Sequence, residues 1–243
     1  MKIHVLHCGY IRIAKDQLYN GGNMRSDILK AAAAPDSRRV TLPVCSYLIE
    51  HPKGLFLVDT GWHRDISPEG EYDPKAVKRE LPLHLASLYR PLVPKGMAID
   101  EQLNSMGIRP EDLEAVLITH LDPDHVSGLR SVSGAKRIII PEDEAYWSIR
   151  TKYRIRQPRD LWECCGYERM FFRGHLIGPM HKAIDVTGDG SIMMVSLPGH
   201  TDGHVGVMTG NGDRYILLAG DSGYSDGSIK EMKPPGLAAD HIL

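Results

Sequence analysis

The sequence predicts an α/β protein in which two β-sheets pack together and carry helices on their outer faces. Three features lead to this prediction: segments typical of strands lie within residues 1–61, segments with helical spacing follow from residue 73, and short strands return after residue 183. Chains with this order of elements bury their apolar surface by stacking the sheets and covering them with helices.

The first 61 residues contain the first set of predicted strands. Residues 1–8 alternate enough to form one strand, and a polar, glycine-rich connection follows it. Residues 40–50 and 54–61 are rich in β-branched and aliphatic side chains and are separated by His51-Pro52-Lys53, which predicts a hairpin.

Helices and strands then alternate. Residues 73–90 have the spacing of leucine, alanine and valine that is typical of a helix, which Pro82 interrupts. Residues 108–120 predict a helical turn and then a buried strand, and residues 137–141 predict another strand, followed by a helix with acidic residues in its first turn. From residue 183 onward, short strands are separated by turns that contain glycine with aspartate or asparagine.

The overall composition excludes several classes of protein. The 29 lysine and arginine residues against 31 aspartate and glutamate residues give a formal net charge of −2, whereas nucleic-acid-binding proteins usually carry a basic excess. No run of about 18 apolar residues occurs, so no membrane-spanning helix is expected.

The N-terminus does not resemble a signal peptide and the cysteines form no C-x-x-C pair, which predicts a cytoplasmic protein with reduced thiols. We expect residues 1–243 to form a single domain.

The segment Thr119–His125 carries the clearest chemical signal. His120, Asp122, Asp124 and His125 offer four metal-binding side chains directly after a strongly apolar strand. The first two of these side chains point to the same side if the segment is extended, and a following turn can bring Asp124 and His125 from another direction. This arrangement suits two metal ions better than one, and imidazole with carboxylate suits zinc, iron or manganese. The alternative is a polar loop without a metal.

Two further strand ends carry similar residues. His200, with Asp202 and His204 close behind it, follows one apolar strand, and Asp221 follows another. In a sandwich these ends can converge at one edge, so His200 and Asp221 join the candidate ligands. Asp202 and His204 are expected to support the metal-site loops, and Asp59, at the end of a fourth strand, is expected to be a supporting carboxylate or a turn former.

Together these motifs resemble the metallo-β-lactamase-fold hydrolases. The resemblance rests on His120-x-Asp122-x-Asp124-His125, Pro198-Gly199-His200, Gly220-Asp221 and Val58-Asp59-Thr60-Gly61, and follows the family's order from about residue 40 to residue 225. Asp221-Ser222-Gly223-Tyr224 and residues 107–120 look most like the N-acyl-homoserine lactonase branch. The resemblance implies an αββα sandwich of two mixed sheets with a dinuclear metal centre at one edge.

The resemblance also implies roles for the residues. His120, Asp122 and His200 would hold one ion, Asp124 and His125 the other, and Asp221 would bridge them. Two divalent ions, preferably zinc but also manganese or iron, would activate a bridging hydroxide that opens a lactone or cleaves an ester or thioester of small-molecule size. Tyr224 would assist the substrate carbonyl, and Asp124 would accept or pass the proton.

This sequence departs from the family pattern at two points. Asp122 stands where the family has a histidine, which adds negative charge and shifts preference toward harder ions. The family also has a last histidine ligand about forty residues beyond the bridging aspartate, whereas this sequence ends at Leu243 and its only later histidine, His241, has the wrong spacing. We therefore expect a C-terminal end that is truncated relative to the family. A phosphodiesterase or di-iron oxidoreductase on the same fold, or a metal-depleted domain without activity, remain alternatives.

Residues 142–182 are expected to form a helical insertion that shapes the substrate site. Its aromatic and aliphatic residues could bind an acyl chain or form the core of the insertion. They are Tyr146, Trp147, Trp162, Phe171, Phe172, Leu176 and Ile177. The basic run from Arg150 to Arg156 could attract an anionic substrate, but a solvated helix face is the expected arrangement.

Overall fold

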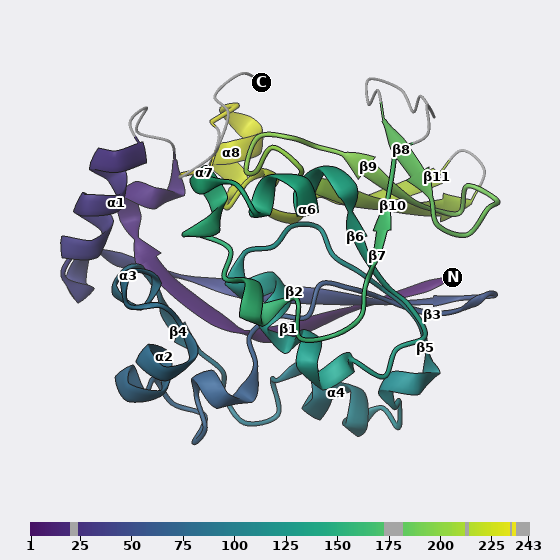
Figure 1. Ribbon diagram of the computed structural model, residues 1–243, viewed down its shortest axis with the longest axis horizontal. Helices are drawn as coiled ribbons and strands as arrows, with labels where there is room; N and C mark the ends of the chain where they lie inside the picture. The colour runs from purple at the N-terminus through teal and green to yellow at the C-terminus, as the bar shows by residue number, and fades with distance from the viewer. Residues whose placement is uncertain (20–23, 173–181, 212–213, 234, 237–243) are drawn as a thin grey trace.

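Two β-sheets face each other in the computed structural model of the chain, which describes residues 1–19, 24–172, 182–211, 214–233 and 235–236 (Figure 1). The larger sheet has the strand order β4-β1-β2-β3-β5-β6-β7, and the smaller has the order β11-β10-β9-β8. The strands are β1 (Lys2–Ala14), β2 (Arg39–His51), β3 (Gly54–Val58), β4 (Arg90–Leu92), β5 (Leu113–Leu117), β6 (Ile138–Pro141), β7 (Glu168–Met170), β8 (Ala183–Asp185), β9 (Ile192–Ser196), β10 (Val205–Asn211) and β11 (Arg214–Leu218).

The helices are short and lie mainly beside the larger sheet. In Figure 1, α2 and α4 lie on the side of this sheet that faces away from the smaller one. The helices are α1 (Met24–Ala33), α2 (Pro74–Glu80), α3 (Leu83–Leu88), α4 (Ile99–Ser105), α5 (Pro123–Val126), α6 (Glu142–Ser148), α7 (Thr151–Arg154) and α8 (Asp226–Lys230). None of the helices in the described ranges is long and apolar enough to cross a membrane.

The larger sheet is mixed. β1, β2 and β3 pair antiparallel, which confirms the predicted hairpin, whereas β3, β5, β6 and β7 pair parallel. Parallel strands that share a direction bring their carboxyl ends to the same edge of a sheet, and in open α/β sheets ligands bind at that edge. Strands β8 to β11 of the smaller sheet pair antiparallel.

The helix predicted over residues 73–90 is divided into two. α2 ends at Glu80 and α3 begins at Leu83, because Pro82 has no N–H to donate and its ring disfavours a helical conformation in the preceding residue. Asp73 begins α2 by accepting hydrogen bonds from the amides of Lys75 and Ala76.

One helix was not predicted from the sequence. α1 begins inside residues 19–27, which were expected to be a polar connection, and continues to Ala33. Its Ala31 is buried in a cluster that includes side chains of α2 and α3. Its last turns contain leucine, lysine and alanine, all strong helix formers, but the glycines that precede it suggested a loop.

A continuous apolar core lies between the sheets. Side chains of β3 and β5 meet those of β9, β10 and β11, so burial of both inner faces stabilises the sandwich. The buried residues are Ile49, Phe56, Val58, Ala115, Leu117, Ile139, Ile184, Ile192, Met194, Val205, Val207 and Leu218.

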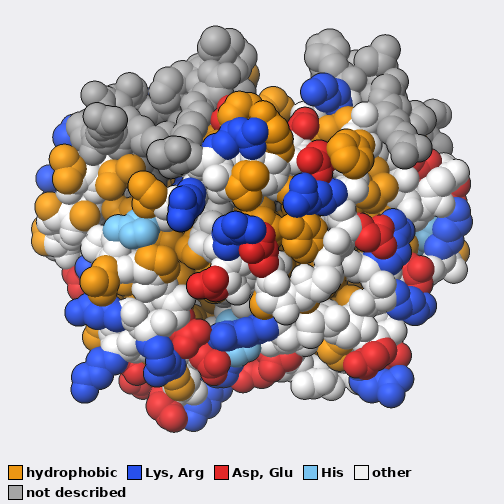
Figure 2. Space-filling view, in the orientation of Figure 1, with side chains coloured by type: hydrophobic (Ala, Val, Ile, Leu, Met, Phe, Trp, Pro, Cys, Tyr) orange, Lys and Arg blue, Asp and Glu red, His pale blue; other side chains and the backbone are white. Residues whose placement is uncertain are grey.

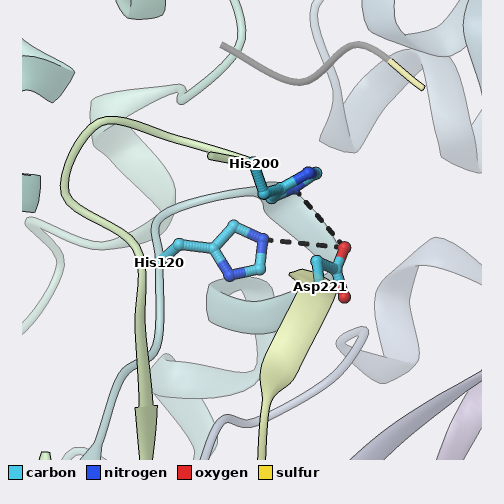
Figure 3. Close-up of side chains that lie close together, drawn as sticks. All are labelled: His120, His200 and Asp221. Carbon is cyan, nitrogen blue, oxygen red and sulfur yellow. Dashed lines mark ion pairs between the residues drawn. The ribbon is translucent and has the colours of Figure 1, made fainter. Parts of the chain in front are cut away.

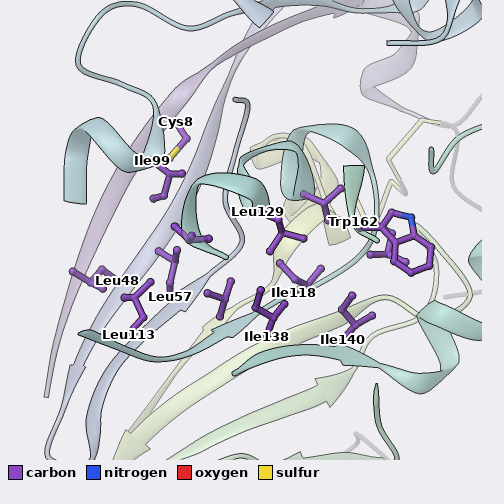
Figure 4. Packing of buried hydrophobic residues seen from close by; sticks show 14 of the residues in the cluster. Cys8, Leu48, Leu57, Ile99, Leu113, Ile118, Leu129, Ile138, Ile140 and Trp162 are labelled. Atoms are coloured by element: carbon purple, nitrogen blue, oxygen red, sulfur yellow. The ribbon is translucent and has the colours of Figure 1, made fainter. Parts of the chain in front are cut away.

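A second cluster fills the opposite face of the larger sheet. Leu48, Leu57 and Leu113 project from the sheet toward Ile99 of α4, and the cluster extends to Trp162, whose side chain is buried (Figure 4). β5, the strand that ends just before His120, is therefore packed on both faces, which holds its end rigidly.

A main-chain hydrogen bond also joins the two sheets at the edge that carries the candidate ligands. The amide of Val205, which begins β10, donates to the carbonyl of Thr119, just after β5, at 3.1 Å. Within the larger sheet, the amide of Asp59 extends the pairing of β3 with β5 by donating to Leu117 at 2.9 Å. On the face shown in Figure 2, acidic and basic side chains are intermixed and form no single basic patch.

Candidate metal centre

The six side chains predicted as metal ligands lie close together between the two sheets. Four of them come from the loop after β5 and from α5, His200 comes from the loop after β9, and Asp221 comes from the turn after β11. Figure 3 shows His120 and His200 directed at Asp221, and ligand atoms of these three residues lie within 4.8 Å of one another.

The protonation of His120 follows from its neighbours. The hydroxyl of Thr119 donates to Asp59 Oδ2 at 2.8 Å, so its oxygen accepts the hydrogen of His120 Nδ1 at 2.9 Å. His120 Nε2 therefore carries a lone pair. This atom is buried without a hydrogen-bond partner among the described residues, and it lies 3.6 Å from Asp122 Oδ2 and 3.8 Å from Asp221 Oδ2. A cation between this lone pair and the two carboxylates would stabilise all three groups, so these residues fit a metal ion.

Asp59 orients the second histidine. It accepts hydrogen bonds from the amide and hydroxyl of Thr119 and from His125 Nδ1, each at 2.8 Å. His125 Nε2 is thereby turned toward Asp221 Oδ1, at 3.3 Å. Asp59 has a positive φ of 57°, a conformation that aspartate tolerates better than most residues. It therefore supports the centre through the histidine and does not itself face the other ligands.

The candidate donor atoms form two positions. We define the first position by His120 Nε2, Asp122 Oδ2, His200 Nε2 and Asp221 Oδ2. His200 Nε2 lies 3.0 Å from Asp122 Oδ2 and 3.5 Å from Asp221 Oδ2. Ligands at the usual zinc distances are roughly 3.4 Å apart around a tetrahedral ion, so the spacing of these atoms suits one.

We define the second position by Asp124 Oδ2, His125 Nε2 and Asp221 Oδ1. His125 Nε2 lies 3.9 Å from Asp124 Oδ2, and Asp221 presents one carboxylate oxygen to each position. A cavity of about 240 Å³ borders the second position, and Tyr224 is part of its wall. The Tyr224 hydroxyl lies 3.4 Å from His200 Nδ1. His241 lies outside the described residues.

Arg156 reaches the first position, which the sequence did not predict. Its Nε lies 2.8 and 2.9 Å from the two oxygens of Asp122, and its Nη2 lies 2.5 Å from both Asp122 Oδ2 and His200 Nε2. The expectation that the run from Arg150 to Arg156 forms a solvated helix face is wrong for Arg156, whose side chain is 14% exposed. The physical reason is that α7 ends at Arg154, so Arg156 lies beyond the helix and can turn toward the buried charge of Asp122.

The charges at the centre shift the pKa values of its carboxyl groups in opposite directions. Burial alone would raise the pKa of Asp122, but the guanidinium of Arg156 and the neighbouring histidines hold it well below its ordinary value. Burial raises the pKa of Asp124 to about 7, and the charges of Asp221 and Asp122 add to this shift while His125 opposes it. In the metal-free chain, Asp122 is therefore ionised, whereas Asp124 can take up or release a proton near neutral pH.

His204 holds the turn that carries Asp221. Its Nδ1 donates to a main-chain carbonyl of its own loop at 2.9 Å, and its Nε2 accepts from the amide of Asp221 at 3.2 Å. Gly220 has a φ of +54°, and a Cβ there would lie 2.7 Å from His204 Nε2, so glycine is required at this position. Asp202 points elsewhere and accepts from the Tyr153 hydroxyl at 2.9 Å.

Glu144 is a further supporting residue that the sequence did not single out. Its side chain is buried on α6 and accepts three hydrogen bonds. Each donor belongs to a residue that directly follows, in the chain, a residue of the centre: His120, Arg156 or His200. The donors are the Leu121 amide at 3.0 Å, Gln157 Nε2 at 2.6 Å and the Thr201 hydroxyl at 2.7 Å. An acidic residue in the first turn of a helix is usual, so the pattern gave no signal for this role.

The segment 142–182 contributes less to the cavity walls than expected. Trp162 belongs to the core, whereas Tyr146 and Phe171 are exposed. Among the described residues of the segment, only Arg156 lines the two cavities at the centre. Leu176 and Ile177 lie outside the described residues.

The chain is similar to known proteins along most of its length. The chain matches the metallo-beta-lactamase superfamily over residues 39–242. It is 28% identical over 191 residues to the probable metallo-hydrolase Rv2300c of Mycobacterium tuberculosis, a match that covers 75% of the chain and 57% of that protein. It is 25% identical over 210 residues to the N-acyl homoserine lactonase AttM of Rhizobium radiobacter, covering 83% of the chain and 73% of the lactonase. The chain thus spans little more than half the length of the mycobacterial relative.

Solved structures agree on the fold. An N-acyl homoserine lactone hydrolase with the product N-hexanoyl-L-homoserine at its catalytic metal centre has a TM-score of 0.71 at 18% identity, covering 97% of the chain and 81% of that protein. A mutant of AiiA from B. thuringiensis with N-decanoyl-L-homoserine bound has a TM-score of 0.72, also at 18% identity and with the same coverage. These likenesses confirm the predicted sandwich fold. The match over residues 39–242 establishes the family: the chain belongs to the metallo-beta-lactamase superfamily.

Proposed function

We propose that the chain is a metal-dependent hydrolase that opens a lactone or cleaves an ester or thioester of a small molecule. The observation that carries this proposal is the position of Asp221, whose two carboxylate oxygens face two different sets of histidine and carboxylate donors. The buried lone pair of His120 Nε2 supports the presence of a cation there. A bound divalent ion lowers the pKa of water toward neutrality and polarises a carbonyl oxygen.

The chain's own residues suit this chemistry. Asp124 lines both cavities beside the centre and can accept the proton that leaves the attacking water. The Tyr224 hydroxyl borders the same cavity and can donate a hydrogen bond to a substrate carbonyl oxygen as negative charge develops on it. These are the roles that the sequence predicted for Asp124 and Tyr224, and they remain proposals.

The walls of the cavities support a substrate with an apolar part. Ile11 and Leu42 line both cavities, and Val44 lines the one beside the second position. An acyl chain placed against these residues would leave its carbonyl group near Asp124 and Asp221. We therefore propose that β1 and β2, and not the aromatic residues of segment 142–182, contact the acyl chain. The likeness to AttM and AiiA supports an acyl-homoserine lactone as the first substrate to test.

The proposal is tested by turnover. Protein loaded with zinc or manganese is mixed with N-acyl-homoserine lactones of different chain lengths and with simple lactones and esters, and acid release is followed. We expect lactone opening that Asp221→Ala abolishes. The matched control is Asp226→Ala, which removes an exposed carboxylate of α8 and should leave the rate unchanged. The assignment fails if metal-loaded protein hydrolyses none of these substrates or if Asp221→Ala retains full activity.

The proposed location is the cytoplasm. All four cysteines are free, and the adjacent Cys164 and Cys165 have their sulfur atoms 3.5 Å apart, well beyond the length of a disulfide bond. Free thiols support a reducing compartment.

A further inference from the structure

The guanidinium of Arg156 engages two of the four donors of the first position. It binds Asp122 through Nε and Nη2, and the same Nη2 lies 2.5 Å from His200 Nε2. Its Nη1 also lies 3.3 Å from the main-chain oxygen of His200. These contacts fix the guanidinium at the edge of the first position that Asp122 and His200 form.

The contact with His200 decides whether this histidine can bind a metal ion. An arginine carries only donors, so in the 2.5 Å contact His200 Nε2 accepts the hydrogen bond from Arg156 Nη2, and its 3.0 Å approach to Asp122 Oδ2 is then a contact without a shared hydrogen. A neutral imidazole nitrogen has one lone pair, and this lone pair cannot accept an N–H and bind an ion at the same time. While Arg156 is in place, His200 is therefore not available as a ligand.

The charge balance favours the same arrangement. Asp122 adds a third carboxylate to a buried centre that already holds Asp124 and Asp221. The side chains of Asp122 and Arg156 are only 6% and 14% exposed, so separating the pair would leave two poorly hydrated charges. An arginine remains protonated at any relevant pH, and its charge neutralises Asp122 without a metal ion.

We infer that Arg156 takes the place of one metal ion in this chain, so that the centre holds a single divalent ion. The donors that Arg156 leaves free are His120 Nε2, Asp124, His125 Nε2 and Asp221, and these hold the one ion. His120 and His125 have ring centroids 4.0 Å apart, and both direct Nε2 toward oxygens of Asp221, at 3.8 and 3.3 Å. The inference rests on the proposed function, because it concerns the same metal centre, but it replaces the expected pair of ions with one.

Metal content tests the inference without measuring activity. Metal-free protein is dialysed to equilibrium against Zn²⁺ with a weak competing chelator, and bound zinc per chain is measured by atomic emission. We expect one equivalent for the wild type and two for Arg156→Met, because the variant releases Asp122 and His200 to bind a second ion. The matched control is Arg154→Met, at the exposed end of α7, which should bind one equivalent.

Each other outcome contradicts a specific claim. Two equivalents in the wild type, or one equivalent in both the wild type and Arg156→Met, would overturn the inference and leave the hydrolase proposal standing. No zinc in either protein would overturn the metal centre and the inference together.

A spectrum of the wild type makes the test independent of the folding of Arg156→Met. Manganese-loaded wild type should give the uncoupled electron paramagnetic resonance signal of an isolated ion. The coupled signal of two ions about 3.5–4 Å apart would contradict the inference.

Discussion

Asp59 accepts a hydrogen bond from His125 Nδ1 at 2.8 Å, and this contact determines which nitrogen of the histidine faces Asp221. The same carboxylate accepts the amide and hydroxyl of Thr119 and so also fixes the residue that precedes His120. One side chain that does not face the donor positions therefore sets the orientation of both histidines.

Asp59→Asn should weaken metal binding about 10- to 100-fold. An amide offers one acceptor oxygen in place of two, and its NH₂ group would face donors, so His125 and Thr119 would lose their fixed orientations. The affinity is measured by competition with a chromogenic chelator. Asp36→Asn, which changes an exposed carboxylate far from the centre, is the control. Equal affinities for Asp59→Asn and the wild type would show that this contact does not orient the ligands.

Gly220→Ala should destabilise the metal-free protein more than Gly96→Ala. Both glycines have positive φ, so both substitutions carry a backbone cost of about 1–2 kcal/mol. Only at Gly220 does the added Cβ meet another group, His204 Nε2 at 2.7 Å, whereas at Gly96 it meets nothing within 4 Å. Urea denaturation measures the free energy of unfolding of each variant. If both variants lose the same free energy of unfolding, the Cβ added at position 220 does not clash with His204.

Glu144 should make the protein less stable as pH rises from about 4.5 to about 7. Burial raises the pKa of Glu144 to about 7, so over this interval the folded chain binds more protons than the unfolded chain. The free energy of unfolding then falls as pH rises, by roughly 3 kcal/mol in total. Glu144→Gln removes the titration and should give a flatter profile. The comparison uses urea denaturation of metal-free protein at pH 5 and pH 7.5, and identical pH dependence in both proteins contradicts the prediction.

Tyr224→Phe should lower kcat for lactone opening roughly 10- to 100-fold while KM and bound metal stay close to the wild-type values. The reason is that the hydroxyl acts on charge that develops in the transition state, not on substrate binding. Tyr215→Phe, on the exposed surface of β11, is the control and should be neutral. If bound metal falls together with kcat, Tyr224 acts through its contact with His200 and not on the substrate.

The sequence predicted the parts of the fold that depend on local pattern. The hairpin of β2 and β3, the interruption at Pro82 and the strand before His120 each follow from neighbouring residues. The convergence of His120, His200 and Asp221 was predictable because each follows a strand, and strand ends meet at an edge. α1 was not predicted, since its stability comes from packing against helices distant in the chain.

The contacts that tune the centre could not be predicted in the same way. Arg156 lies more than thirty residues after Asp122, just beyond a short helix, and no periodicity indicates that it turns inward. One signal was present: an additional buried carboxylate at position 122 calls for a counter-charge, and the arginines within residues 150–156 were among the basic residues that could supply it. Glu144 gave no such signal, because its role depends on three donors from separate segments.

Stepwise addition of zinc to the metal-free protein, with lactone hydrolysis measured at each step, tests the central claim most directly. The proposed hydrolase activity and the single proposed ion together predict that the rate rises in proportion to added metal up to one equivalent per chain and then stays constant. A protein that opens no lactone or ester at any metal ratio, or whose rate does not depend on metal, would contradict the claim that this centre is a metal-dependent hydrolase.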